Sequence, residues 1–171
     1  MYTHHWVYQP GHPRYHQVWP TILEDSRRII EQVRHAGIVI AGPDGYRRPA
    51  LDPADGIGFN GDATSDLDGN PFQLLAPLPT HPRGIPTART SCTTRRKPYD
   101  LAVAAVLLRC RILLPDVFHI RSDGVWDIEW ACGATTASGG TGIGARRLVA
   151  DLFGEVPDTD PVHSTLLPGE G

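Results

Sequence analysis

Lysine is almost absent from this chain of 171 residues, whose 16 basic residues are Lys97 and 15 arginines. Arginine codons are GC-rich, so we attribute this bias to coding before function. The formal net charge is −3, which excludes a protein that binds nucleic acid through its overall charge.

Cysteine is equally scarce. The three cysteines, Cys92, Cys110 and Cys132, are odd in number and form no C-x-x-C pair, which argues against a disulfide framework and a cysteine zinc site. No run of 18 apolar residues occurs, and the N-terminus lacks an apolar core of signal-peptide length. We therefore expect a cytoplasmic protein without a membrane span.

The composition predicts one loop-rich domain, since 16 prolines and 18 glycines accompany 40% hydrophobic residues. Residues 1–19 hold many aromatic and histidine side chains without helical periodicity. They predict an arm that is disordered or laid over the core, or sequence upstream of a misplaced start. Residues 20–156 form the predicted domain, and the Pro-rich residues 157–171 predict a disordered tail.

Three helices are predicted within this domain. The first covers residues 22–36, because Thr21 and Glu24 have capping-box spacing and Gly37 suits the position after the helix. The second covers residues 98–113 and is apolar on almost all faces, which is typical of a central buried helix. The third covers residues 143–153.

Short apolar runs predict strands at residues 38–41, 56–60 and 71–78. Residues 118–130 alternate and predict a hairpin whose loop is Ser122–Gly124, although a helix starting near Val125 is the alternative. The predicted fold is α+β: a small, mostly antiparallel sheet packed against a central buried helix with two flanking helices.

The Gly-rich stretch before the last helix resembles a dinucleotide-binding turn. Gly140, Gly142 and Ala145 fit the G-x-G-x-x-A spacing. However, no convincing strand precedes the turn, and no strand is expected after the helix. We therefore predict a linker, with no dinucleotide and no other cofactor.

The stretch 51–70 carries five aspartates and no basic residue. Residues 64–69 approach a calcium-binding loop, but Thr64 replaces the first carboxylate and Leu75 stands where a bidentate ligand is required. We expect solvated turns and no metal site here. The aspartates are Asp52, Asp55, Asp62, Asp66 and Asp68.

The stretch 81–97 is basic and ends just before the second helix, where the helix dipole already leaves positive charge. The preferred interpretation pairs these cations with the acidic stretch. The alternative is an anion site that binds nucleic-acid phosphate or an acidic protein surface. Its candidate residues are Arg89, Arg95, Arg96 and Lys97.

Three weaker constellations complete the candidates, and for each a structural role is the preferred interpretation. They are a possible metal site from the N-terminal histidines, a thiol nucleophile with a histidine, and a general acid and base from carboxylates. Their members are, in that order, His4, His5, His12 and His16; Cys92 and His81; and Asp123, Asp127 and Glu129.

Two segments, residues 96–100 (Arg-Lys-Pro-Tyr-Asp) and 122–124 (Ser-Asp-Gly), together with Trp130, resemble small uncharacterised proteins of high-GC actinomycetes and their phages. That resemblance implies a cytoplasmic accessory protein and carries no catalytic residue. The predicted function is a non-enzymatic binding or interaction module with an Arg-rich, anion-facing loop. A small hydrolase or transferase that uses the Asp- and Arg-rich loops is the alternative.

Overall fold

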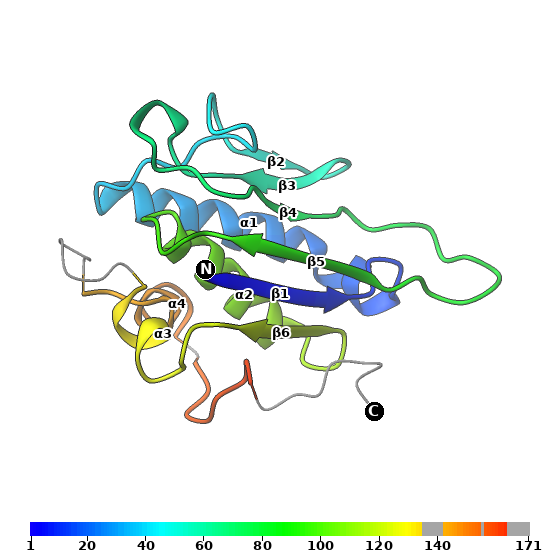
Figure 1. Ribbon diagram of the computed structural model, residues 1–171. Coiled ribbons are helices and arrows are strands. Elements are labelled where there is room, and N and C mark those ends of the chain that lie inside the picture. The colour runs from blue at the N-terminus through cyan, green and yellow to red at the C-terminus, as the bar shows by residue number, and fades with distance from the viewer. Residues whose placement is uncertain (135–141, 155, 164–171) are drawn as a thin grey trace.

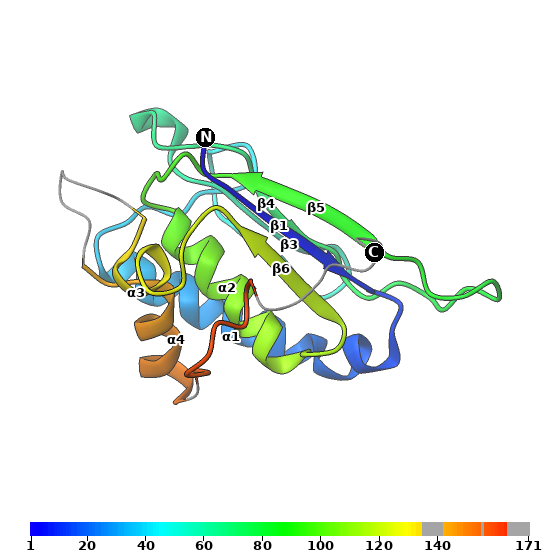
Figure 2. The same cartoon turned by 60° about the horizontal axis from the view of Figure 1, so that its bottom comes forward.

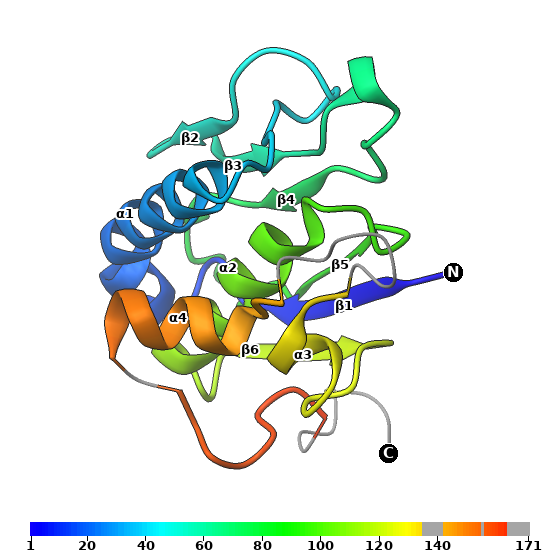
Figure 3. The same cartoon turned by 90° about the vertical axis from the view of Figure 1, so that its left-hand side faces the viewer.

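The protein consists of a layer of β-sheet and a layer of helices (Figure 1, Figure 3). The computed structural model describes residues 1–134, 142–154 and 156–163. Two antiparallel sheets of three strands lie side by side in the first layer, in the orders β5-β1-β6 and β2-β3-β4. The Asn70 N–H donates to the Thr93 carbonyl at 3.1 Å, and this backbone hydrogen bond joins the two sheets.

The first sheet is built around the N-terminal strand. β1 (Thr3–Tyr8) pairs with β5 (Ala88–Thr93) on one side and with β6 (Phe118–Ser122) on the other. Side chains alternate along β1, so that Trp6 is fully buried against the helices whereas His5 is exposed on the opposite face. The second sheet contains β2 (Ala50–Asp52), β3 (Gly56–Phe59) and β4 (Phe72–Leu74).

The helical layer is centred on α2 (Asp100–Leu113), of whose 14 residues ten are buried. It packs against α1 (Pro13–His35) and α4 (Ala145–Phe153). The short elements α3 (Glu129–Cys132) and η1 (Ala63–Ser65) lie in loops. The predicted α+β class, with a central buried helix and two flanking helices, is therefore confirmed. No helix in the described part of the chain is long and apolar enough to cross a membrane.

The prediction of an N-terminal arm is wrong. Residues 3–8 are the middle strand of a sheet, and residues 13–19 are the first turns of α1. The aromatic side chains of this segment supply core volume, for example Trp6 and Tyr15, which have no exposed surface. Five of the six residues of β1 are buried, with His5 as the exception, so the strand lacks the clear alternation that marks a half-buried strand.

The first helix begins nine residues before its predicted start at residue 22. Pro13 occupies the first turn, where its missing N–H costs no hydrogen bond, and the His12 side chain accepts a bond from the Arg14 N–H at 3.0 Å. Thr21 is therefore an interior residue and not a cap. The second and third helices begin two residues later than predicted and end as predicted.

The strand predictions were partly wrong. Residues 56–59 and 72–74 are strands, but residues 38–41 form only a single bridge from Ala41 to Asn60. The hairpin around residues 122–124 is absent, because the chain leaves β6 and turns into α3. The helical alternative is the better description, although α3 begins at Glu129 and not near Val125. A strand would place Ile128 on the same face as Trp126 and Trp130, but Ile128 is exposed and both tryptophans are buried.

Parts of two other predicted segments lie outside the described residues. The Gly-rich turn falls mostly on residues 135–141, and most of the predicted tail falls on residues 164–171. Residues 157–163 are described, and Val162 among them is fully buried. His163 reaches the end of β6, where its Nε2 lies 3.0 Å from the Ser122 carbonyl oxygen.

Candidate functional site

Lys97 is held by the acidic stretch. Its ammonium group donates to the Asp66 carbonyl at 2.9 Å and also to the Asp68 carbonyl, and it lies 3.6 Å from the Asp66 carboxylate. The intramolecular pairing preferred from the sequence is therefore present for Lys97. Because these contacts occupy its ammonium group, Lys97 stabilises the loop before α2 and is less available to an external ligand.

Arg96 is paired elsewhere, with a residue that the sequence did not suggest. Its guanidinium bonds the Glu129 carboxylate at 3.0 Å and lies 4.4 Å from the centre of the Tyr2 ring. Burial raises the pKa of Glu129, but the Val125 N–H and Arg96 outweigh burial, so that this pKa is lower than usual. Arg96 therefore joins the N-terminus to α3.

Arg95 is exposed and differs from its two neighbours. Its φ of 55° and the φ of 61° at Arg96 are both left-handed, which is unusual for residues other than glycine. Arg95 lines a surface depression of about 430 Å³ together with Met1, Tyr2 and Arg96. The four predicted anion-site residues are thus separated, since Arg89 lies on β5.

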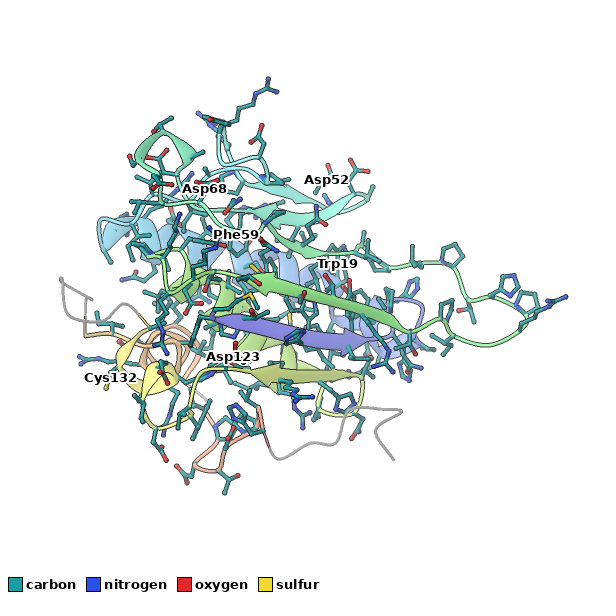
Figure 4. All side chains as sticks on the ribbon, viewed as in Figure 1. Trp19, Asp52, Phe59, Asp68, Asp123 and Cys132 are labelled. Carbon is teal, nitrogen blue, oxygen red and sulfur yellow. The ribbon has the colours of Figure 1, made fainter. Side chains whose placement is uncertain are left out.

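The acidic stretch is used for turns. Asp62 accepts bonds from the Thr64 N–H, the Thr64 hydroxyl and the Ser65 hydroxyl, and these side-chain bonds lower its pKa. Asp52 and Asp68 lie at opposite ends of the second sheet (Figure 4). Within residues 1–134, 142–154 and 156–163, no three His, Cys, Asp or Glu side chains are grouped as metal ligands.

The N-terminal histidines are likewise separated. His4 is fully buried and His5 is exposed, because they point to opposite faces of β1. His12 caps α1, and the His16 Nε2 lies 2.8 Å from the Leu78 carbonyl oxygen. The four histidines therefore contact different parts of the structure and are not grouped at one site.

Cys92 is enclosed and does not resemble an activated nucleophile. Its side chain is fully buried, burial raises its pKa to about 12, and its thiol donates to the Asn70 carbonyl at 3.1 Å. His81, proposed as its partner, is exposed in the turn before Gly84. Cys132, by contrast, is exposed on α3 (Figure 4).

The three carboxylates after β6 are engaged separately. The Asp123 carboxylate accepts the Thr3 N–H at 2.9 Å, and Asp127 bonds Arg146 at 2.8 Å. Glu129 is held by Arg96. The geometry therefore pairs none of them with another as general acid and base.

One face of the first sheet carries a basic surface. Figure 2 shows α1, α2 and α4 on one side of β5, β1 and β6, so that the other face is open. The register sets His5 opposite Ser91 on one neighbour and opposite Arg121 on the other, while Arg89 is opposite Val7. We call His5, Arg89, Ser91 and Arg121 the open-face patch; all four are exposed.

The open-face patch surrounds a shallow depression of about 590 Å³. Its acidic neighbour is Asp123, whose position at the end of β6, beside the start of β1, is visible in Figure 4. Two arginines and one carboxylate give the residues that line this depression a net positive formal charge, with His5 counted as neutral. The sequence analysis found Arg89 but missed Arg121, although alternation with the buried Phe118 and Ile120 assigns Arg121 to the outer face.

Beneath the same sheet lies a polar chain, which we call the Ser-His-Asp chain: the half-buried Ser122 and the buried His4 and Asp100. The Ser122 Oγ is 2.8 Å from the His4 Nδ1, and the His4 Nε2 is 2.8 Å from the Asp100 Oδ1. The Thr94 hydroxyl also donates to the Asp100 Oδ1, at 2.6 Å. These residues come from β6, β1 and α2, and no sequence spacing connects them.

Aromatic rings enclose the Ser-His-Asp chain. Tyr2 and Trp130 contact the His4 imidazole edge to face, with ring centres 5.3 and 5.6 Å away. The Trp130 indole N–H donates to the Ser122 Oγ at 3.3 Å, and the Gly124 N–H donates to it at 2.9 Å. The segments 96–100 and 122–130 therefore meet around the start of β1.

The fold and these sites define a two-layer α+β protein with a basic open sheet face and a Ser-His-Asp chain. Comparison with protein-family models, curated proteins and solved structures found no match.

Proposed function

We propose that this protein is an anion-binding accessory module and that the open-face patch binds phosphate groups. The observation that carries this proposal is the exposure of Arg89 and Arg121 around one depression, on a sheet face that α1, α2 and α4 leave open. Guanidinium groups bind phosphate oxygens through paired N–H donors, which makes arginine well suited to this ligand.

The surrounding residues support phosphate over an apolar ligand. Ser91 adds a hydroxyl and His5 an imidazole at the rim of the depression, and both can donate hydrogen bonds to oxygen. No Tyr, Trp or Phe belongs to the open-face patch, so base stacking does not contribute to the recognition proposed here. The ligand is therefore recognised by its charge and not by its bases.

The proposal relocates the anion site that the sequence predicts. Arg89 is retained. Lys97 and Arg96 are assigned to internal pairs, and Arg95 lies at a different depression. Arg121 and His5 complete the site through strand pairing, which brings together residues more than 80 positions apart.

The test measures binding of a fluorescein-labelled 20-nucleotide oligothymidylate by anisotropy from 50 mM salt upwards. For each phosphate contact that an Arg→Gln substitution removes, the slope of log K against log salt should fall by about 0.7. The double variant Arg89→Gln/Arg121→Gln should therefore bind at least about tenfold more weakly at low salt, and its slope should be smaller by about 1.4.

A matched control removes the same charge from the helical layer. Arg27 on α1 and Arg147 on α4 are exposed and lie in surface ion pairs. Arg27→Gln/Arg147→Gln should leave binding close to that of the unchanged protein. Equal weakening by the two double variants, or no salt-dependent binding by the unchanged protein at 50 mM salt, would contradict the proposal.

A further inference from the structure

The hydrogen-bond direction along the Ser-His-Asp chain follows from its ends. The Asp100 carboxylate can only accept, so the His4 Nε2 must carry the proton that it donates to Asp100. The His4 Nδ1 is then the acceptor, and the Ser122 hydroxyl donates to it. A hydroxyl that donates to an imidazole, which in turn donates to a carboxylate, is the arrangement that activates a serine nucleophile.

We propose that Ser122 is a nucleophile activated by His4 and that this protein hydrolyses small esters through an acyl-Ser122 intermediate. This proposal is independent of the open-face patch, because His4 and Ser122 point to the helical side of the sheet. The ring nitrogens are exchanged relative to the common serine-protease arrangement, in which the serine bonds Nε2. The exchange leaves the order of proton transfers unchanged.

The proposed reaction has two balanced steps. In the first, the Ser122 Oγ forms a bond to the ester carbonyl carbon, and its proton moves to the His4 Nδ1. The bond to the alcohol oxygen then breaks, and the alcohol leaves with that proton. In the second step, water gives a proton to His4 and attacks the acyl carbon, and the proton returns to the Ser122 Oγ as the acid departs.

Substrate would reach Ser122 from the side away from His4. Ser122 is partly exposed and lines a depression of about 420 Å³ together with Gly124, Trp126 and His163. His4 and Asp100 are buried, which suits a base that has to reach only the serine proton.

Charge around this depression selects the substrate class. Its lining includes the carboxylates of Asp123, Asp127, Asp158 and Asp160, of which Asp127 is paired with Arg146 and Asp160 with His163. A negatively lined depression favours esters that are neutral or carry a positive charge, and it disfavours anionic ones. Its volume limits the substrate to a small ester.

Two N–H donors already point at the nucleophilic oxygen. The Gly124 N–H and the Trp130 indole N–H both donate to the Ser122 Oγ before substrate binds. After attack this oxygen becomes an ester oxygen, which is a weaker acceptor than the new oxyanion beside it. Attack needs a free lone pair on the Oγ, so one of these bonds must break first, and we expect the released N–H to donate to the oxyanion, where charge develops.

Asp100 is the positioning residue of the chain. It holds the His4 imidazole in the required tautomer and is itself oriented by the Thr94 hydroxyl. The change Asp100→Asn preserves shape but can present an N–H to His4, which would favour the unreactive tautomer. It should lower kcat for ester hydrolysis by about 10²–10⁴-fold with little change in KM, because substrate contacts remain.

The decisive experiment treats the full chain with a fluorophosphonate reagent. The Ser122 Oγ forms a bond to phosphorus, fluoride leaves, and the proton passes to His4. Mass spectrometry of the intact protein and of its peptides should find one adduct per chain, on Ser122. The change Ser122→Ala should abolish it, whereas Ser65→Ala, at an exposed serine on η1, should leave it unchanged.

Esters of p-nitrophenol extend the test to turnover. Neutral and cationic acyl groups should be hydrolysed at least about tenfold faster than by Ser122→Ala, and faster than an anionic acyl group. A folded, unmodified chain that forms no Ser122 adduct with excess reagent overturns the proposal, whatever the stability of the variants. Equal turnover by the unchanged protein and a folded Ser122→Ala overturns it as well.

Discussion

At the scale of single residues, burial decides which side chains can react. Two of the three cysteines are in the core, where the charged thiolate is poorly solvated, and burial raises the pKa of Cys92 to about 12. Burial also raises the pKa of Cys110. Cys132 is exposed on α3. The three thiols therefore differ in their exposure to solvent and to reagents.

The first prediction concerns these thiols. Iodoacetamide at pH 8 should alkylate one cysteine in the native protein, Cys132, and peptide mass spectrometry should locate the adduct. Thiolate reacts and thiol does not, so Cys92 and Cys110 are protected by both burial and raised pKa. In denaturant all three should react. Rapid alkylation of Cys92 in the folded chain would contradict its placement in the core.

A second prediction at this scale concerns Gly144, which begins α4. A Cβ there would lie 2.3 Å from the Trp130 carbonyl oxygen and 2.5 Å from the Ala131 carbonyl carbon. Backbone atoms cannot yield as flexible side chains do, so Gly144→Ala should destabilise the fold by about 1–3 kcal/mol. Denaturant unfolding measures this change in free energy.

Gly11 is the matched control for this measurement. Its added Cβ would meet its nearest atoms at 3.5 Å, which is ordinary contact. Gly11→Ala should therefore change the free energy of unfolding by no more than about 0.5 kcal/mol. Equal effects at the two glycines would show that α3 and α4 do not approach as closely as described.

At the scale of elements, one ion pair ties the helical layer together. The Asp25 carboxylate on α1 bonds the Arg109 guanidinium on α2 at 2.7 Å, and both side chains are largely buried. The same guanidinium lies 4.3 Å from the centre of the Phe153 ring on α4. Arg109 therefore contacts both helices that flank α2.

The third prediction follows from this pairing. Asp25→Asn should lower the free energy of unfolding by about 3–5 kcal/mol, because it leaves the buried Arg109 charge without its counterion. Glu24→Gln is the control, since Glu24 is next in sequence but pairs with Arg27 on the surface. Its effect should be at most about 1 kcal/mol in the same denaturant titration. A small change in the free energy of unfolding of Asp25→Asn would contradict the burial of the Arg109 guanidinium.

At the scale of the whole molecule, the N-terminus organises both layers. β1 supplies the middle of the first sheet, the outward His5 of the open-face patch and the inward His4 of the Ser-His-Asp chain. Trp6 on the inner face stacks on Phe72 of β4, with ring centres 5.0 Å apart, and so connects the two sheets. The segment predicted as a peripheral arm is thus central to the fold and to both candidate sites.

The fourth prediction tests this centrality with two adjacent residues. Trp6→Ala should destabilise the protein by about 3–5 kcal/mol, through lost burial and a residual cavity. His5→Ala, on the exposed face of the same strand, should change stability by no more than about 0.5 kcal/mol. Thermal or denaturant unfolding measures both. Similarly small effects of the two substitutions would contradict the placement of residues 3–8 in the middle of the sheet.

The sequence alone determined those elements whose local pattern is strong. A helix was predicted at residues 98–113, and α2 forms at 100–113, because apolar residues cover nearly all of its faces and a helix of that kind must be buried. The α+β class followed from alternating helical and strand patterns. The internal partner of Lys97 was also predictable, because opposite charges in neighbouring loops tend to meet.

Only the tertiary structure decided the place of β1 and the composition of both sites. Strand pairing brings His5 beside Arg121, and the packing of β1 on α2 brings His4 to Asp100, contacts that span 116 and 96 positions. No sequence period encodes such contacts, since they depend on which strands become neighbours and in which register. The aromatic N-terminus was mistaken for an arm because its burial comes from partners that lie far along the chain.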